Sequence, residues 1–154
     1  MLPIKNILVP IDFSAHSEYA AKYAKELAVP IKAAVHLVHV LEPINTYGTW
    51  EGLPLADLTG KAVQESEQKL QQMALEFQNA GCQVHIKVLE GHPDSAINEY
   101  AIVHGIDIIS IGTHGRRGLE YILFGSTTEK VLRTAPCSVL AVRMPKDERD
   151  ALKH

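Results

Sequence analysis

The chain has 154 residues, the size of one ordinary domain, and 46% of them are apolar, so it can bury a full core and wholesale disorder is excluded. Fifteen Lys and Arg against 18 Asp and Glu give a net charge of −3, which argues against non-specific nucleic-acid binding. Cys82 and Cys137 are too few for a disulfide framework, and no apolar run reaches the roughly 18 residues of a membrane helix. We therefore expect a soluble, cytoplasmic single domain over residues 1–154, without membrane insertion and without a nucleic-acid partner.

Five short segments rich in Val and Ile predict β-strands. In chain order they are Ile4–Ile11, Ala33–Val40, Gln83–Leu89, Ile106–Ile111 and Ser138–Val142. The first, second and fourth are almost continuously apolar, which indicates burial on both faces. Burial of that kind is typical of strands in a parallel sheet.

The segments between these strands have the apolar spacing of helices. The apolar residues of each, in chain order, are Tyr19, Tyr23 and Leu27; Leu70, Met73, Ala74 and Phe77; Ile97, Tyr100 and Ala101; and Val131 and Leu132. The third helix is predicted to begin at Asp94 after Pro93, and Pro136 ends the fourth, which begins near Ser126.

This alternation of strands and helices predicts an α/β fold, with a parallel sheet and helices on both of its faces. The periodicity leaves two strand orders open, the flavodoxin-like 2-1-3-4-5 and the order 3-2-1-4-5. Two long connections, Glu42 to Leu58 and Gly112 to Gly125, leave from the carboxyl edge of the sheet. Open α/β sheets bind their ligands at this edge, so we expect the functional site there.

The second long connection is rich in glycine and runs into a helix. Its glycines are Gly112, Gly115, Gly118 and Gly125. Glycines let backbone N–H groups approach an anion closely, and Ser126 with Glu129 fits a capping box that would begin a helix behind Gly125. This pattern predicts an anion site, with phosphate as the usual occupant. The P-loop fingerprint is absent, and the first strand-to-helix turn has none of the glycines of a dinucleotide fold.

The spacing of Gly112, Gly115 and Gly125-Ser126 resembles the ATP-binding signature of the universal stress protein family, G-x2-G-x9-G-[ST]. The opening segment Ile7–Ser14 and the closing segment Ala135–Val142 are similar to that family too, although Ser138 stands where many members have proline. The resemblance spans Ile4–Arg143 and implies a Rossmann-like, adenine nucleotide alpha hydrolase-like fold. Its five-stranded parallel sheet has the order 3-2-1-4-5, with Asp12 and Gly112 at the point where the strand order reverses.

The resemblance also implies a nucleotide site that binds ATP, with Mg²⁺ or Mn²⁺ as an optional companion of the phosphates. In such a site, Pro10 and Asp12 lie beside the ribose and adenine, and Val40 offers its backbone to the adenine edge. The residues implied around the ribose and phosphates are Gly112, His114, Gly115, Arg116, Gly125, Ser126 and Thr127. The alternatives are a turn or N-cap role for Asp12, turn chemistry for the glycines and a merely solvated charge for Arg116.

The remaining patterns favour binding over catalysis. His36 and His39 lie three residues apart in one predicted strand, so they face opposite sides and cannot share a metal ion. The glycine connection supplies His114 and arginines but no obvious carboxylate base, and we assign no catalytic residue. The favoured function is a nucleotide-sensing regulatory protein of the stress response. The alternative is a slow ATPase or nucleotidyl-transfer enzyme on the same scaffold.

The predicted edge of the sheet suggests how the chain would associate with a second copy of itself. In the family order Ser138–Val142 is an edge strand, whose unpaired backbone groups invite another strand. The resemblance implies antiparallel pairing of this strand with its copy across a two-fold axis, which gives a homodimer and leaves a tetramer open. A protein partner that receives the signal is expected but not identified by the sequence.

Overall fold

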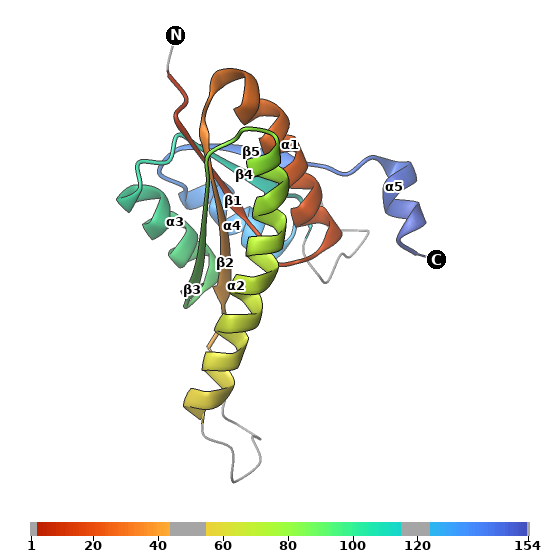
Figure 1. Ribbon diagram of the computed structural model, residues 1–154. Helices are drawn as coiled ribbons and strands as arrows, with labels where there is room; N and C mark the ends of the chain where they lie inside the picture. The colour runs from red at the N-terminus through yellow and green to blue at the C-terminus, as the bar shows by residue number, and fades with distance from the viewer. Residues whose placement is uncertain (1–2, 44–54, 115–123, 154) are drawn as a thin grey trace.

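The computed structural model describes residues 3–43, 55–114 and 124–153, with the side chains of 55–57 left out. The strands of the described chain form one parallel sheet in the order β3-β2-β1-β4-β5 (Figure 1). They are β1 (Asn6–Pro10), β2 (Ala34–Leu41), β3 (Val84–Glu90), β4 (Ile108–Gly112) and β5 (Ser138–Val142). The five predicted strands are therefore confirmed. The observed order is the second of the two alternatives that periodicity left open, and it is the one the family resemblance implied.

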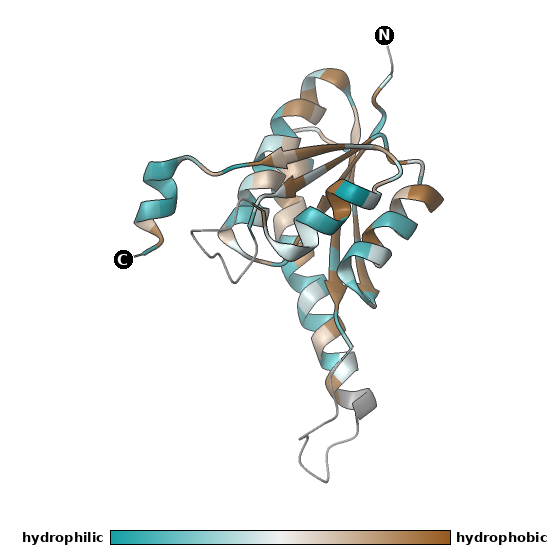
Figure 2. Cartoon of the chain, turned by 180° about the vertical axis from the view of Figure 1, so that it is seen from behind, coloured by the Kyte–Doolittle hydropathy of each residue, from teal (hydrophilic) through white to brown (hydrophobic). Residues whose placement is uncertain are grey.

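Helices cover both faces of the sheet. The covering helices are α1 (Ala15–Ile31), α2 (Leu55–Asn79), α3 (Pro93–Val103) and α4 (Ser126–Thr134), and a further helix, α5 (Lys146–Ala151), follows β5. One core lies between the sheet and α1 with α2, and the other lies between the sheet and α3 with α4. Figure 2 shows the strands as largely apolar and the outer helix surfaces as largely hydrophilic. The short helix α5, which the apolar periodicity did not predict, has no buried residue of its own.

The buried face of α1 differs from the predicted one. Tyr19 is partly buried against the core, as predicted, but Tyr23 is 46% exposed and Leu27 is 37% exposed, so the rest of the stripe that repeats every four residues does not face the sheet. The residues that do are small: Ser17, Ala20, Ala21, Ala24 and Ala28. Alanines let a helix axis approach a sheet closely, and this close approach outweighs the larger apolar area of the tyrosines. The predicted face of α2 is confirmed by the buried Leu70, Ala74 and Phe77.

The packing of α1 places its first turn against the end of β4. An ideal Cβ built on Gly112 would lie 2.8 Å from the backbone oxygen of His16, a distance that real Cβ atoms essentially never show. Gly112 is therefore required by close packing, whatever its role toward a ligand. Strand β1 pairs with β2 on one side and with β4 on the other, so the carboxyl ends of these strands meet beside α1.

Candidate functional site

The turn after β1 holds Asp12 by two hydrogen bonds. The backbone N–H of Ser14 donates to Oδ1 of Asp12 at 2.9 Å, and the N–H of Asp12 donates to Oγ of Ser17 at 3.3 Å. Ser14 is the N-cap of α1, and its side chain accepts a hydrogen bond from the N–H of Ser17. Asp12 therefore has the turn role that the sequence offered as an alternative to ligand binding. It is not the N-cap of α1, because that residue is Ser14. The carboxylate stands at the carboxyl edge of the sheet, as predicted.

Phe13, the next residue of this turn, has an unusual backbone conformation. Its φ is 62°, a left-handed value that a bulky residue rarely adopts. The Phe13 ring lies 4.6 Å from the ring of His39, and Nζ of Lys69 lies 5.0 Å over the Phe13 ring. Nδ1 of His39 makes a hydrogen bond with the backbone oxygen of Ile11 at 2.6 Å, which ties the turn to β2.

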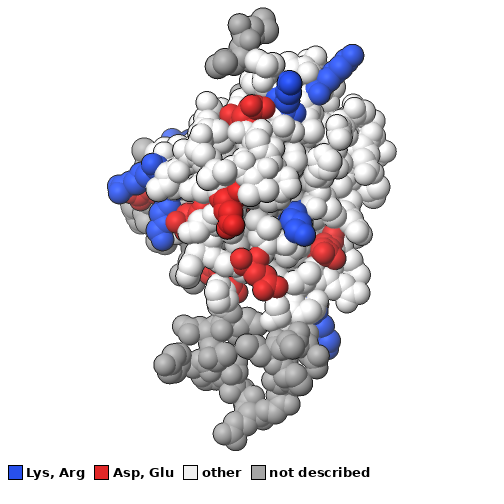
Figure 3. All heavy atoms as spheres, turned by 90° about the vertical axis from the view of Figure 1, so that its left-hand side faces the viewer, with Lys and Arg blue, Asp and Glu red and all other residues white. Residues whose placement is uncertain are grey.

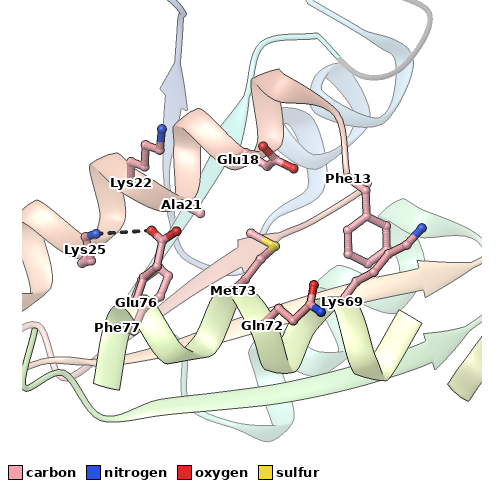
Figure 4. Close-up of a pocket in the computed structure, with 10 residues that line it drawn as sticks. All are labelled: Phe13, Glu18, Ala21, Lys22, Lys25, Lys69, Gln72, Met73, Glu76 and Phe77. Atoms are coloured by element: carbon pink, nitrogen blue, oxygen red, sulfur yellow. Dashed lines mark ion pairs between the residues drawn. The ribbon is translucent and has the colours of Figure 1, made fainter. Parts of the chain in front are cut away.

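A groove of about 450 Å³ runs between α1 and α2, with Phe13 and Lys69 at one end and the Lys25–Glu76 ion pair, 3.6 Å long, at the other (Figure 4). Its other lining residues are Glu18, Ala21, Lys22, Gln72, Met73 and Phe77. None of the residues that the sequence assigned to the nucleotide lines this groove. It borders the predicted site through Phe13, the neighbour of Asp12, and is separate from it.

The two ends of the glycine connection are joined by hydrogen bonds. The N–H of Gly125 donates to the backbone oxygen of Thr113 at 2.7 Å. Oγ1 of Thr128 donates to the backbone oxygen of Gly112 at 2.7 Å. These bonds hold the N-terminus of α4 at the carboxyl end of β4, which is the arrangement the glycine spacing predicted. The predicted ligand residues Gly115 and Arg116 lie outside the described residues.

The predicted capping box is wrong. Gly125, with φ −64° and ψ 162°, is the N-cap of α4, and Ser126 is already the first helical residue. Glu129 accepts a hydrogen bond from Nη2 of Arg133 at 2.8 Å, one turn further along the helix. A capping box needs its Ser in the extended N-cap conformation, and here the glycine occupies that position. Gly125 has no side chain that could cap α4, and among the described residues the N-terminus of this helix has no side-chain cap.

A second histidine, which the sequence did not single out, lies beside His114. The ring centroids of His16 and His114 are 5.4 Å apart, and Nδ1 of His114 lies 3.1 Å from Oγ1 of Thr113. Burial lowers the pKa of His16, and so do His114 and Arg149, whereas Asp12 raises it. The one sequence feature that could have identified His16 as a site residue is its position two residues after the N-cap of α1, at the carboxyl edge of the sheet.

The structure brings the described residues of the prediction to one edge of the sheet. Pro10 ends β1, Val40 is the last but one residue of β2, and Gly112 ends β4. His114 follows β4, and Gly125, Ser126 and Thr127 begin α4. Asp12 and His114 both interact electrostatically with His16.

The histidines of β2 face opposite sides, as predicted. Nδ1 of His36 makes a hydrogen bond with the hydroxyl of Tyr100 on α3 at 2.9 Å, whereas His39 contacts Ile11 and Phe13 on the α1 side. The described residues contain no cluster of three or more potential metal ligands. They also contain no helix that is long and apolar enough to span a membrane. On the face shown in Figure 3, the cationic and acidic side chains are interspersed.

Comparison with known proteins places this geometry in context. A model described as the universal stress protein family matches residues 3–143. Universal stress protein MJ0531 of Methanocaldococcus jannaschii is 37% identical over 149 residues, covering 94% of this chain and 85% of that protein. The solved structure of hypothetical protein MJ0577, from the same organism, superimposes with a TM-score of 0.82 at 29% identity. That match covers 94% of this chain and 99% of the other.

A likeness in fold extends to a solved nucleotide complex. The universal stress protein of Archaeoglobus fulgidus in complex with dAMP has a TM-score of 0.64 to this chain. The two chains are 20% identical, and the match covers 91% of this chain and 98% of the other.

Proposed function

Because this chain belongs to the universal stress protein family, we propose that it is a nucleotide-binding regulatory protein of the stress response whose ligand is ATP. One observation carries the proposal: the end of β1, the end of β4 and the N-terminus of α4, which no described side chain caps, converge at the strand-order reversal. This is the position at which open α/β sheets bind ligands. The dAMP complex of a protein with the same fold supports an adenine nucleotide as the ligand. The proposal treats residues 1–154 as a single domain.

In the proposed complex, the adenine lies at Pro10 and Val40, and the ribose hydroxyls donate to the carboxylate of Asp12. The phosphates lie at the start of α4, where backbone N–H groups and the helix dipole favour negative charge. The residues proposed to surround the phosphates are Gly112, His114, Gly125, Ser126 and Thr127, together with Gly115 and Arg116. Mg²⁺ or Mn²⁺ would neutralise phosphate charge as an optional companion.

The described side chains favour ATP binding without rapid ATP hydrolysis. Phosphoryl transfer needs a positioned base or a cationic clamp that is stronger in the transition state. Glu129 is engaged with Arg133, and Oδ1 of Asp12 is engaged with Ser14. Backbone N–H groups hold a ground state as well as a transition state, so they do not by themselves raise the chemical rate. The alternative remains a slow ATPase or nucleotidyl-transfer enzyme, which steady ATP turnover would reveal.

We further propose a homodimer through β5, one of the two edge strands of the described sheet, with a tetramer as its extension and an unidentified protein partner downstream. The N–H of Thr113 donates to the backbone oxygen of Val142 at 3.1 Å, so Val142 directs its backbone toward β4. Successive residues of a strand direct their backbone groups to opposite sides, which leaves those of Val139 and Ala141 on the outer side. These are the groups that a second copy of β5 would meet.

Calorimetry with ATP tests the nucleotide site. Gly125→Ala adds a methyl group where backbone would meet phosphate, and we expect it to weaken ATP binding about tenfold. Gly60→Ala is the matched control, because a Cβ on Gly60 in α2 meets nothing within 4 Å. Circular dichroism should show both variants folded. Equal affinity of the parent and both variants would refute the assignment of the phosphates to the start of α4.

A further inference from the structure

His16 reaches the proposed phosphate site through packing between α1 and β4. It is the second residue of α1, and its backbone oxygen lies against Gly112 at the end of β4. Its ring lies 5.4 Å from the ring of His114. His16 is therefore held next to residues that the proposed function assigns to the nucleotide, although it stands about a hundred residues before them in the chain.

The imidazole of His16 has a nitrogen that the described chain leaves without a partner. Its Nδ1 is buried from solvent and makes no hydrogen bond to any described residue. His16 as a whole is half-buried, and the buried histidines differ from it, because Nδ1 of His36 bonds Tyr100 and Nδ1 of His39 bonds the backbone of Ile11. A buried polar atom without a partner costs free energy, and such an atom calls for a partner from outside the protein. A phosphate oxygen is an acceptor that a protonated imidazole would bond.

The groups around His16 set its protonation state, and a bound phosphate would favour the protonated form. Asp12 faces it from the end of β1, His114 from the end of β4, and Arg149 from α5. Burial and the two basic neighbours outweigh Asp12 and hold the pKa of His16 below its ordinary value of 6.5, so the imidazole is neutral at pH 7. A polyphosphate beside the ring would favour the charged form and raise that pKa. Binding would then draw a proton from solvent.

Building on the proposed function, we propose that His16 is a phosphate-contacting residue outside the glycine motif, and that its imidazole takes up a proton as the phosphates bind. Affinity for nucleotide then rises as the pH falls through the neutral range. The effect is larger for ATP than for adenosine, which has no phosphates. The same crevice therefore responds to nucleotide and to acidity together.

The test is calorimetry of ATP binding to the parent protein, His16→Gln and His92→Gln. Measuring the enthalpy in PIPES and in Tris, which differ in ionisation enthalpy, counts the protons taken up. His92 is the matched control because it is exposed, lies at the N-cap of α3 beyond β3, and makes no capping bond. The ionisation of ATP itself is common to all three proteins, so differences between them isolate the imidazole.

We expect the parent and His92→Gln to take up part of a proton and to bind ATP about three- to tenfold more weakly at about pH 8 than at about pH 6. In His16→Gln, most of the proton uptake and most of the pH dependence should be lost. NMR titration of the His16 ring in the parent gives a second measurement, and ATP should move its titration to higher pH.

Two negative results are distinguishable. Equal proton uptake by the parent and His16→Gln, or a His16 titration that ATP does not move, would overturn the inference and leave the proposed function intact. Failure of all three proteins to bind ATP would refute the proposed function itself. If His16→Gln folds but no longer binds ATP, the contact is supported, and the NMR titration of the parent decides the proton uptake.

Discussion

His36 should make the fold sensitive to acid well above the pH at which carboxylates titrate. Its side chain lies between β2 and α3 and is 6% exposed. The rings of His85 and His104 lie 4.7 and 5.8 Å from it, and its hydrogen-bond partners are the Tyr100 hydroxyl and, at 3.4 Å, the Asn6 amide oxygen. Burial and then the two neighbouring imidazoles lower the pKa of His36 to about 4.

The sign of the effect follows from linkage. The unfolded chain binds a proton at His36 near pH 6.5, whereas the folded chain binds it only near pH 4, so stability falls as the pH falls between these values. At about 1.4 kcal/mol per pKa unit, lowering the pH from about 7.5 to about 5 should reduce the free energy of unfolding by about 2 kcal/mol. Below pH 4 both states are protonated and the loss levels off.

Urea unfolding at these two pH values measures the effect. His36→Asn removes the titrating group and retains a polar partner for Tyr100, so its absolute stability should be lower but its loss in acid smaller than that of the parent by about 2 kcal/mol. His92→Gln, which removes an exposed imidazole, should keep the full loss. The reasoning would be refuted if His36→Asn and the parent lost the same free energy between the two pH values.

Three further outcomes follow from backbone geometry. Phe13→Gly and Phe13→Ala both remove the ring, but only glycine adopts the left-handed φ without strain. The Phe13→Gly variant should therefore be about 1 kcal/mol more stable than Phe13→Ala in urea unfolding, and the opposite order would contradict backbone strain at this position. Gly112→Ala should lower stability by about 1–3 kcal/mol because its Cβ meets the His16 backbone, whereas Gly60→Ala should raise stability slightly; thermal unfolding separates them. If the proposed dimer forms, Ala141→Pro should remove an outward N–H and give monomers in sedimentation, while Gly60→Ala stays dimeric; a monomeric parent would exclude the dimer.

The strands and their burial were predictable because a parallel sheet leaves a strong local signal. In β1 the consecutive residues Ile7, Leu8 and Val9 are all fully buried, so both faces of the strand are covered and the sequence shows no apolar–polar alternation there. The strand order was not predictable from periodicity, since it depends on which faces pack after the chain has crossed over. It became predictable only from the family resemblance, which carries that non-local information.

Two predictions about the helices were wrong. Spacing alone favoured Tyr23 and Leu27 as the buried face of α1, but the alanines face the sheet. A motif of four residues favoured a capping box at Ser126, but Gly125 had already taken the extended N-cap conformation. The small alanines of α1 permit a close approach to the sheet, which residue hydrophobicity does not report, and the four-residue pattern at α4 does not report which residue begins the helix.

The candidate site was predictable to the extent that it lies at strand ends. Asp12 follows the end of β1 and Gly112 ends the neighbouring strand β4, so the topology alone brings them to the same edge of the sheet. His16 was missed because its place beside His114 depends on the contact between α1 and β4, which leaves no motif in the chain. The roles of Gly115 and Arg116 stay predictions, because they lie outside the described residues.

Because of the hydrogen bond from Gly125 to Thr113, the glycine connection is also a place where one segment of chain can be replaced by another. Its two ends are 2.7 Å apart, donor to acceptor, and Thr128 anchors the same junction to Gly112. A replacement of residues 115–123 would therefore begin and end at anchors that belong to the sheet and α4, and closure entropy changes only slowly with loop length. Exchanging this segment among relatives could thus diversify what the crevice binds while the scaffold beneath it keeps its stability, both in natural divergence and in engineered sensors.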